Sequence, residues 1–339
     1  MNKKSGNQTI TFKEPVSILS CASVAGKKEG EGPLSKYFDK IMSDAEWGEE
    51  TWEKTESKMQ KTALSRAVEK AKVDLKDIDF LFAGDLLNQC TSSTFAFRGF
   101  GVPFLGVYGA CSTMAETLGL ASSMIDGGFA QKTAAVTSSH FCTAERQYRF
   151  PLEYGGQRPP TAQWTVTGSG AVVLGKSGGQ GPFVTHFTAG KIVDAGISDA
   201  NNMGAAMAPA AAETLVAHFK DTERTPDFYD LILTGDLGKI GKSIAIDLCG
   251  EQGFDLAPCY KDCGLMVFDL QKQDVHSGGS GCGCGAITLC GYVMDCFRAG
   301  KLKNVLFVGT GALLSPTSSM QGESIPCVAH AVALSANRE

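Results

Sequence analysis

Two apolar runs that lie far apart in the chain share one pattern of hydrophobic and polar positions. Residues 78–86 have the sequence IDFLFAGDL, and residues 229–237 have the sequence YDLILTGDL. In each run a continuous apolar stretch leads to Gly-Asp-Leu. Such stretches are typical of central strands in a sheet that is covered on both faces. The pattern therefore predicts one buried strand in each half of the chain.

A second pattern is also repeated. After Cys111, an apolar helical segment at 114–125 leads to a predicted strand at 133–138. After the glycine-rich turn at 281–284, another apolar helical segment leads to a predicted strand at 304–309. Strand–helix–strand units with right-handed crossovers build a sheet with helices on both faces. We therefore predict an α/β fold made of two duplicated halves.

The two halves are expected to be residues 1–180 and 181–339, because the glycine-rich stretch at 177–182 is the clearest break between them. Two predicted elements stand outside the repeat. Residues 22–50 are rich in charge and glycine and are expected to form a loop or cap, and a helix is predicted at 51–72.

A second segment without a repeat partner lies at 141–163. It is predicted to be a long loop, and it contains Arg146, Arg149 and Arg158 with aromatic residues between them. Loops of this length in compact domains are usually functional or mobile. His218 lies in an amphipathic helical segment, where we expect it at the surface.

Composition narrows the class of protein. The chain has 339 residues, of which 43% are hydrophobic and 20% charged, as in ordinary globular proteins. The formal net charge of −5 gives no reason to expect nucleic acid or an anionic membrane surface as a partner. The apolar stretch at 205–219 is interrupted by Pro209 and Glu213, so no transmembrane segment is expected. Residues 1–11 lack the apolar core of a signal peptide, and we therefore expect the 12 cysteines to be reduced.

Two cysteine pairs have spacings that invite a metal interpretation. The pairs are Cys259 with Cys263 and Cys282 with Cys284. Structural zinc needs two well-spaced pairs that meet in a tetrahedron. The second pair lies in a glycine-rich turn, and Cys290 and Cys296 follow it along an apolar helix. We therefore interpret these residues as packed free thiols and expect neither a metal site nor a cofactor.

The segment Gly109-Ala110-Cys111-Ser112-Thr113 places a cysteine between a predicted strand at 103–108 and the predicted helix at 114–125. A sharp strand-to-helix turn presents its side chain beside a helix N-terminus, where the helix dipole favours a thiolate or a bound anion. Cys111 is therefore a candidate nucleophile and also a candidate member of a binding site.

Three of these features together resemble the thiolase and ketoacyl synthase superfamily. They are the repeated strand that ends in Gly-Asp-Leu, the cysteine turn at 109–113 and the glycine-rich turn at 278–285. The strand at 165–174 is similar to the strand that closes the first half of those enzymes. The resemblance implies five layers, helix–sheet–helix–sheet–helix, and a homodimer.

Three further runs resemble a narrower family, the stage V sporulation protein AD family of spore-forming bacteria. They are FAGDLLNQ at 82–89, TAERQ at 143–147 and MAPAAA at 207–212. This resemblance implies that the chain binds dipicolinic acid (pyridine-2,6-dicarboxylate), free or as its calcium complex, and helps to move it into the developing spore. It also implies membrane-protein partners and a peripheral place at the cytoplasmic side or surface of the forespore inner membrane.

The chain departs from the condensing enzymes of the superfamily at two positions. After the second buried strand, where those enzymes have a histidine, it has Asp236. At the later glycine-rich turn, where they have an asparagine or a second histidine, it has Ser280. A carboxylate beside Cys111 raises the thiol pKa by like-charge repulsion. We therefore rank non-covalent binding first and keep an acyltransferase or condensing enzyme that uses Cys111 as the alternative.

The side chains expected to line the ligand site are Cys111, His140, Arg146, Asp236 and Ser280. His140 follows a predicted strand, and the carboxyl ends of strands open onto the crevice where such folds bind ligands. Arg146 is preferred to Arg149 and Arg158 because it lies nearest to His140 in sequence, and a guanidinium group fits a carboxylate through two hydrogen bonds.

Overall fold

Strand pairing repeats in the two halves of the chain. The computed structural model describes residues 3–148, 158–176 and 181–338, and within them two sets of five strands have the same order. The first set is β5–β4–β6–β8–β2 and the second is β11–β10–β13–β14–β9, and antiparallel pairing of β2 with β9 joins them. The strands are β2 (Thr9–Ala25), β4 (Phe80–Gly84), β5 (Phe104–Gly106), β6 (Lys132–Ser139), β8 (Gly168–Gly175), β9 (Phe183–Thr188), β10 (Leu231–Thr234), β11 (Tyr260–Asp262), β13 (Asn304–Ala312) and β14 (Cys327–Ser335).

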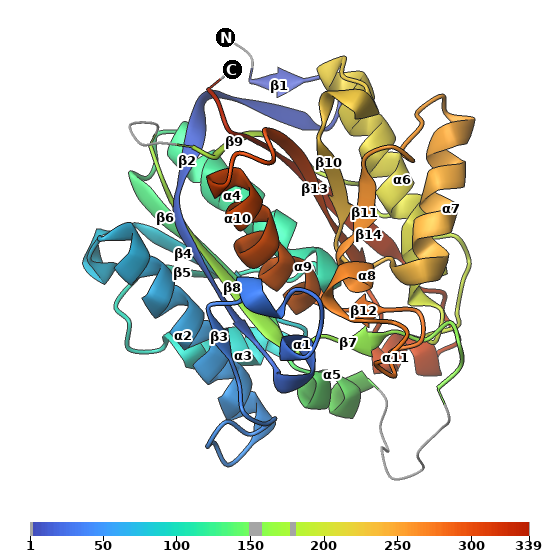
Figure 1. Cartoon of the computed structure of the whole chain (residues 1–339), viewed down its shortest axis with the longest axis horizontal. Helices are drawn as coiled ribbons and strands as arrows, with labels where there is room; N and C mark the ends of the chain where they lie inside the picture. Colours follow the sequence, from blue (N-terminus) through green and yellow to red (C-terminus); the bar gives the residue numbers. More distant parts are fainter. Residues whose placement is uncertain (1–2, 149–157, 177–180, 339) are drawn as a thin grey trace.

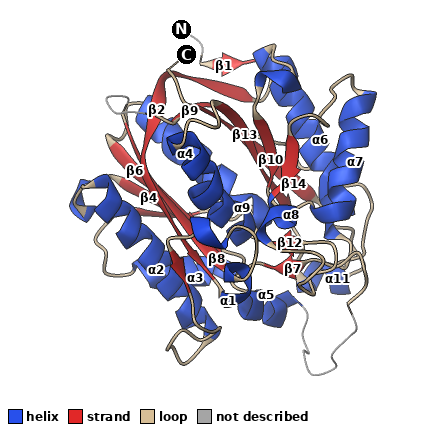
Figure 2. Cartoon of the chain, in the orientation of Figure 1, coloured by secondary structure: helices blue, strands red, loops and turns tan. Residues whose placement is uncertain are grey.

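Helices cover both faces of these strands, as the fold prediction requires. The helices that cover the strands are α2 (Trp52–Ala71), α3 (Thr91–Phe97), α4 (Thr113–Asp126), α6 (Met203–Thr222), α7 (Gly238–Glu251), α9 (Cys282–Thr288) and α10 (Met294–Arg298). Figure 1 shows α2 and α3 on one outer side, α6 and α7 on the other, and α4, α9 and α10 between the two sets of strands. The same sandwich of helix and strand layers is visible in Figure 2, and the predicted five-layered α/β fold is confirmed.

Short elements connect these layers and carry much of the candidate site. They are β1 (Lys4–Ser5), α1 (Lys27–Gly30), β3 (Lys40–Ile41), α5 (Phe141–Tyr148), β7 (Trp164–Thr165), α8 (Cys263–Val267), β12 (Gly279–Ser280) and α11 (Pro316–Met320), with single turns at Ser35–Tyr37, Leu75–Asp77, Asn88–Cys90, Ala110–Ser112, Pro226–Phe228 and Leu289–Val293. Strands β7 and β12 pair in parallel and form a separate two-stranded sheet beside α9.

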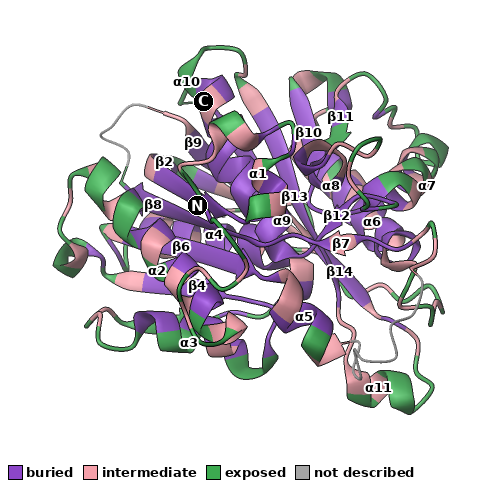
Figure 3. Cartoon of the chain, turned by 60° about the horizontal axis from the view of Figure 1, so that its bottom comes forward, coloured by how far each residue is buried: buried purple, intermediate pink, exposed green. Residues whose placement is uncertain are grey.

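Among the middle helices, α9 is enclosed most completely. Every residue of α9 is buried, and Figure 3 shows the burial continuing through the neighbouring strands. The glycines of α9 allow this close packing, since a Cβ on Gly283 would lie 2.6 Å from the carbonyl oxygen of Gly168. The outer helix α2 instead exposes a polar face and begins at Thr51, whose Oγ1 accepts from the Lys54 N–H at 3.3 Å.

Two local predictions about loops are wrong. Residues 22–25 belong to β2 and not to the loop, because they pair with β8 and are buried between covered faces. The segment at 141–163 begins with the helix α5, whose first N–H, that of Phe141, donates to Thr167 Oγ1 at 3.0 Å. Arg149 and the glycine-rich residues at 177–180 lie outside the described residues.

The expectation that His218 lies at the surface is also wrong. It is fully buried in α6, where its Nδ1 is 2.8 Å from Thr188 Oγ1 and its Nε2 is 2.6 Å from the Tyr229 hydroxyl. The small apolar residues around it pack α6 so closely on the sheet that the polar ring is enclosed with its partners.

Candidate functional site

Cys111 lies in a strained turn directly before α4. The preceding residue, Ala110, has φ = 50°, a left-handed conformation that costs a residue with a Cβ about 1 kcal/mol or more. The turn is held by Gly109, whose carbonyl oxygen accepts from the Ser112 N–H at 3.0 Å and the Ser112 hydroxyl at 2.7 Å. It packs directly on β13, where a Cβ on Gly311 would lie 2.3 Å from the Gly109 oxygen. The turn therefore holds the thiol at the boundary between the two halves.

Asp236 is the centre of the hydrogen bonds behind this thiol. It is fully buried, and its carboxyl accepts from the Thr310 hydroxyl at 2.6 Å, the Gly281 N–H at 2.8 Å and the Ser280 hydroxyl at 3.2 Å. The Cys111 thiol lies next to this carboxyl, near enough for each group to shift the pKa of the other. The structure thus brings together Cys111, Asp236 and Ser280 from three distant parts of the sequence.

The electrostatics of this group oppose thiolate formation. Burial raises the pKa of the Cys111 thiol well above its usual range, and the neighbouring Asp236 carboxyl raises it further. Burial also raises the pKa of Asp236, although the donors around it act in the other direction. A thiol in this setting is a weak nucleophile, because the thiolate is the reactive form.

No imidazole compensates for this effect. All five histidines are among the described residues, and their hydrogen bonds and ion pairs are made elsewhere, with none to Cys111. A second buried carboxyl, Asp262, lies near Asp236 and accepts from the N–H groups of Leu237 and Gly238 at 2.8 and 3.0 Å. Burial, more than its neighbour Asp236, raises the pKa of Asp262 to about 7. The surroundings of the thiol are therefore acidic.

A cavity of about 60 Å³ opens beside Cys111 and Ser280. Its walls are mostly apolar, and its lining residues are Leu86, Cys111, Ala144, Glu145, Tyr148, Thr165, Ala200, Met203, Ser280, Ala312 and Leu314. None of these described lining residues is a lysine or arginine. The polar groups of its lining include the hydroxyls of Thr165 and Ser280, whereas the Tyr148 hydroxyl already donates to the Leu86 carbonyl oxygen at 2.6 Å.

The structure places His140 and Arg146 away from this cavity. His140 lines a separate, larger cavity, where its Nε2 donates to the Ala45 carbonyl oxygen at 2.9 Å and its Nδ1 accepts from the Cys142 N–H at 3.2 Å. Both ring nitrogens are therefore engaged, and burial lowers the pKa of His140. Arg146 is half exposed on α5, bonded to the Glu53 carboxylate. It lines neither cavity.

Sequence reasoning missed several residues that build the site. Thr310 and Asp262 hold Asp236 and its turn, and both lie at strand ends where nothing in their local sequence sets them apart. Glu56 was also missed, because it lies in a helix with a mostly polar sequence. It is fully buried and accepts from the hydroxyls of Ser138 at 2.8 Å and Thr143 at 2.7 Å. Its position on the inner face of α2 is the signal that could have found it.

Comparison with known proteins identifies the family. Residues 6–335 match the family described as Stage V sporulation protein AD. The chain is 47% identical to the stage V sporulation protein AD of Bacillus subtilis (strain 168) over 330 residues, which is 97% of each chain. The chain belongs to the stage V sporulation protein AD family. This membership supports a role in sporulation.

Solved structures of condensing enzymes share the fold. A 3-oxoacyl-[acyl-carrier-protein] synthase III from Aquifex aeolicus VF5 matches with a TM-score of 0.54 and 14% identity, over 94% of this chain and 99% of that one. A variant of Xanthomonas campestris OleA with cerulenin matches with a TM-score of 0.61 and 15% identity, over 96% and 97%. AbyA1, a tetronic acid condensing enzyme, matches with 0.59 and 17%, over 94% and 99%. At these identities the likeness establishes the fold alone.

The described residues also bear on whether the chain has a membrane-spanning helix or a metal site. None of the described helices combines the length and the apolar character that crossing a bilayer requires. Within the same residues, no group of three or more histidine, cysteine, aspartate and glutamate side chains is placed to hold a metal ion. Cys282 and Cys284 are buried, and the Cys282 thiol donates to the Ser138 carbonyl oxygen at 2.9 Å.

Proposed function

We propose that the chain binds dipicolinate (pyridine-2,6-dicarboxylate) without covalent chemistry in the cavity beside Cys111. In this proposal it supports the movement of the ligand, with calcium, into the developing spore, together with membrane proteins at the forespore inner membrane. The observation that carries the proposal is the partner of Cys111, which is the buried Asp236 carboxyl and not an imidazole. A cysteine nucleophile needs a neighbour that lowers the pKa of its thiol or a base that removes its proton. Asp236 instead raises the pKa of the Cys111 thiol.

The charge of the ligand sets a condition on this cavity. A carboxylate taken out of water without compensation costs several kcal/mol, and no described lining residue is a cation. Two routes satisfy the condition. Asp236 can remain protonated, as burial favours, so that it adds no repulsion and its group can donate a hydrogen bond. Alternatively, the ligand arrives as its calcium complex, in which the two charges of the dicarboxylate are cancelled.

The size of the cavity sets a second condition. About 60 Å³ holds a few water molecules, whereas binding cavities for small ligands usually start at about 300 Å³. Binding of an aromatic ring therefore requires the walls to move. The Leu86 carbonyl oxygen accepts from both Tyr148 and Gln147 of α5, at 2.6 and 3.0 Å, so these two hydrogen bonds must shift or break if α5 moves away from Leu86.

Calorimetric titration with dipicolinate, with and without calcium, tests the proposal. We expect saturable heat from the parent protein, and about fivefold weaker binding for Ser280→Ala, because one hydrogen bond is worth about 1 kcal/mol. Ser65→Ala, which changes an exposed serine of α2 that does not line the cavity, should bind like the parent. An absence of heat together with an absence of thermal stabilisation would count against the proposal.

An acyltransferase is the second candidate function. It is favoured by the strained turn that presents Cys111 and by the fold shared with condensing enzymes. Intact-protein mass spectrometry after incubation with acetyl-coenzyme A distinguishes the two candidates. Non-covalent binding predicts an unchanged mass, whereas an acetyl adduct that maps to Cys111 would establish the second candidate.

We also propose that the protein is a homodimer that pairs through β5. This strand ends the sheet, and its three residues are exposed, including Phe104 at 37% and Leu105 at 40%. An exposed apolar edge strand is a template for pairing with another chain. Sedimentation velocity should show a dimer that Leu105→Glu converts to a monomer. Ile192→Glu, at a similarly exposed apolar position elsewhere, should leave the dimer intact.

A further inference from the structure

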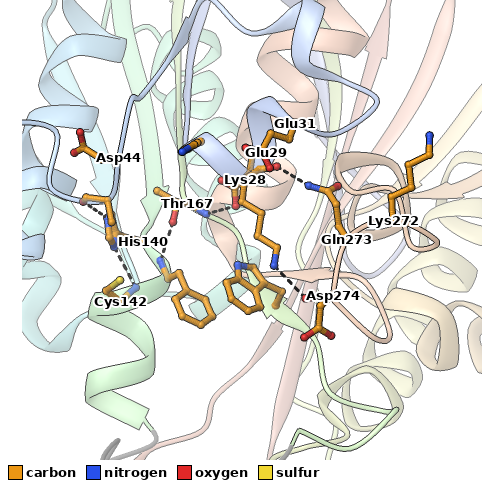
Figure 4. Close-up of a pocket in the computed structure, with 15 residues that line it drawn as sticks. Lys28, Glu29, Glu31, Asp44, His140, Cys142, Thr167, Lys272, Gln273 and Asp274 are labelled. Atoms are coloured by element: carbon orange, nitrogen blue, oxygen red, sulfur yellow. Dashed lines mark hydrogen bonds between the residues drawn. The ribbon is translucent and has the colours of Figure 1, made fainter.

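A second cavity, of about 560 Å³, lies on the other side of α5 and β7 from the Cys111 cavity. Its walls come from α1, the loop around Asp44, the start of α5, β7 and the loop at 272–274, as Figure 4 shows. Its volume falls in the range of about 300 to 1,000 Å³ that is usual for small-molecule sites. The Cys111 cavity is several times smaller.

The central feature of this second cavity is the ammonium group of Lys28. It lies 3.5 Å from the centroid of the Trp164 ring and donates to the Asp274 carbonyl oxygen at 3.1 Å. No carboxylate among the described residues lies within 4.0 Å of it. Partial burial lowers the pKa of Lys28, and the Asp274 carboxylate acts in the other direction without forming an ion pair with it. An ammonium has three N–H donors, and one protein acceptor leaves others for an anion.

The acidic residues of the cavity face other partners. The Asp274 carboxylate lies 2.9 Å from His276 Nε2, and the buried Glu29 carboxyl accepts from the Thr167 N–H at 2.9 Å. Glu31 and Asp44 stand at the exposed rim. The inner part of the cavity therefore presents the positive charge of Lys28 and not the negative charge of the acids.

Aromatic and polar contacts hold this arrangement in place. Phe141 stacks on Trp164 with ring centroids 3.9 Å apart and an angle of 9° between the planes. Gln273 Nε2 donates to the Lys28 carbonyl oxygen at 2.8 Å, so the 272–274 loop contacts both ends of this lysine (Figure 4). His140, engaged at both nitrogens, ties the loop at Ala45 to α5. The site is therefore built before any ligand arrives.

The two cavities share one partition. Trp164 lines the larger cavity and the next residue, Thr165, lines the Cys111 cavity, because successive residues of a strand point to opposite sides. The helix α5 contributes to both along its length, because its first residues Phe141 and Cys142 line the larger cavity and the later residues Glu145 and Tyr148 line the Cys111 cavity. A displacement of β7 or α5 at one cavity therefore also moves part of the wall of the other.

We propose that the Lys28 cavity is a second anion site, which takes a small aromatic carboxylate and lies back to back with the Cys111 cavity. The ligand identity rests on the proposed function. The ammonium matches a carboxylate, and the Phe141 ring, which also lines the cavity, matches a planar ring. Both faces of Trp164 are already covered, by Phe141 and by Lys28. The Lys28 cavity receives the ligand in its charged form. The Cys111 cavity holds the ligand without a lysine or arginine side chain among its described lining residues.

Tryptophan fluorescence and calorimetry test this second site together. In a protein with Trp47→Phe and Trp52→Phe, Trp164 is the one remaining tryptophan, since the chain has three. Dipicolinate is expected to quench it saturably and to bind at two molecules per chain. Lys28→Met keeps the stem but removes the charge, and it should weaken the Trp164 response at least tenfold and reduce the stoichiometry to one. Lys36→Met is the matched control, because Lys36 also lies over a ring, at 5.1 Å from the Tyr37 centroid, and lines neither cavity.

Failure of this inference differs from failure of the proposed function. One molecule per chain with an unchanged Trp164 signal, or a Lys28→Met variant that binds like the parent, would overturn the second site and leave the Cys111 site standing. If dipicolinate binds nowhere, the proposed function fails, and isophthalate, which has the same shape without the ring nitrogen, becomes the probe. A Lys28-dependent response to isophthalate would then support the anion site, and its absence would overturn that site as well.

Discussion

Asp236→Ala is expected to abolish binding of dipicolinate in the Cys111 cavity and to lower the free energy of unfolding by about 3 kcal/mol or more. The Asp236 carboxyl accepts from Thr310, Gly281 and Ser280 in a fully buried position. Each donor left without an acceptor costs about 1 to 3 kcal/mol. The same change removes the group that orients the Ser280 hydroxyl and lies next to the Cys111 thiol, so the polar groups that face the ligand lose their fixed positions. Chemical denaturation and calorimetry measure the two losses.

The conservative variant separates the charge of Asp236 from its shape. Asp236→Asn is neutral at every pH and should retain binding within about tenfold at neutral pH, because the proposed binding form has an uncharged group here. The affinity of the parent for dipicolinate should fall as the pH rises, since ionisation of Asp236 places a negative charge beside the ligand. The affinity of Asp236→Asn should change less with pH. An alanine variant that binds like the parent would contradict this role of Asp236.

A cellular measurement extends the same prediction. In a spore-forming host that relies on this chain, Asp236→Ala should give spores with much less dipicolinate than the parent. The protein should be recovered with the spore membrane fraction. Ser65→Ala serves as the control strain, because Ser65 is exposed on α2 and lines neither cavity. Normal dipicolinate content in the Asp236→Ala spores would show that dipicolinate uptake does not depend on this site.

The free energy of unfolding is expected to fall by about 2 kcal/mol as the pH rises from about 6.5 to about 8.5. Burial raises the pKa of Glu56 to about 8 and the pKa of Glu29 and Asp262 to about 7. Each folded-state pKa lies above the unfolded value, so the native state binds more protons in this window. The stability that these groups contribute is complete below their unfolded pKa and is lost as the pH rises through the folded pKa.

Histidines whose pKa is lowered by burial act in the opposite direction. Burial lowers the pKa of His218 to about 3 and the pKa of His186 and His330 to about 4. Their contribution is complete above the unfolded pKa of about 6.5 and is lost as the pH falls through the folded values. Above pH 6.5 they add only the last part of their stabilisation, about 1 kcal/mol in all, which the three carboxyls outweigh.

Denaturant unfolding at a series of pH values measures this balance. Glu56→Gln should reduce the fall between about pH 6.5 and about pH 8.5 to less than about 1 kcal/mol, because Glu56 carries the largest share. Glu251→Gln, which changes an exposed carboxylate on α7, should leave the fall unchanged. A parent protein whose stability rises over this window would show that the buried carboxyls are ionised in the native state.

The sequence was sufficient to predict the architecture, because buried strands leave a local signal. The two Gly-Asp-Leu runs became β4 and β10, which occupy equivalent places in the two strand sets. Element ends were predicted less well, as residues 22–25 show, because pairing with β8 and not local composition continues β2 to Ala25. His218 was misplaced for a similar reason, since its enclosing partners Thr188 and Tyr229 come from other elements.

The candidate site was predicted in part. The glycine-rich turns placed Cys111, Asp236 and Ser280 at the boundary between the halves, where the structure brings them together. His140 and Arg146 are nearby in sequence but face other directions, because the path of α5 decides where each side chain points. Lys28 could not have been singled out, since a lysine in a charged segment gives no sign that it will lie over Trp164.

The central claim is that the space beside Cys111 holds a dicarboxylate without forming a bond to sulfur. A crystal structure of the protein grown with dipicolinate tests it most directly. The account predicts an opened cavity, with the ring beside Cys111, one carboxylate on Ser280, and no density that joins ligand and thiol. A ligand found solely at other surfaces while this cavity stays closed, or a covalent adduct on Cys111, would contradict it.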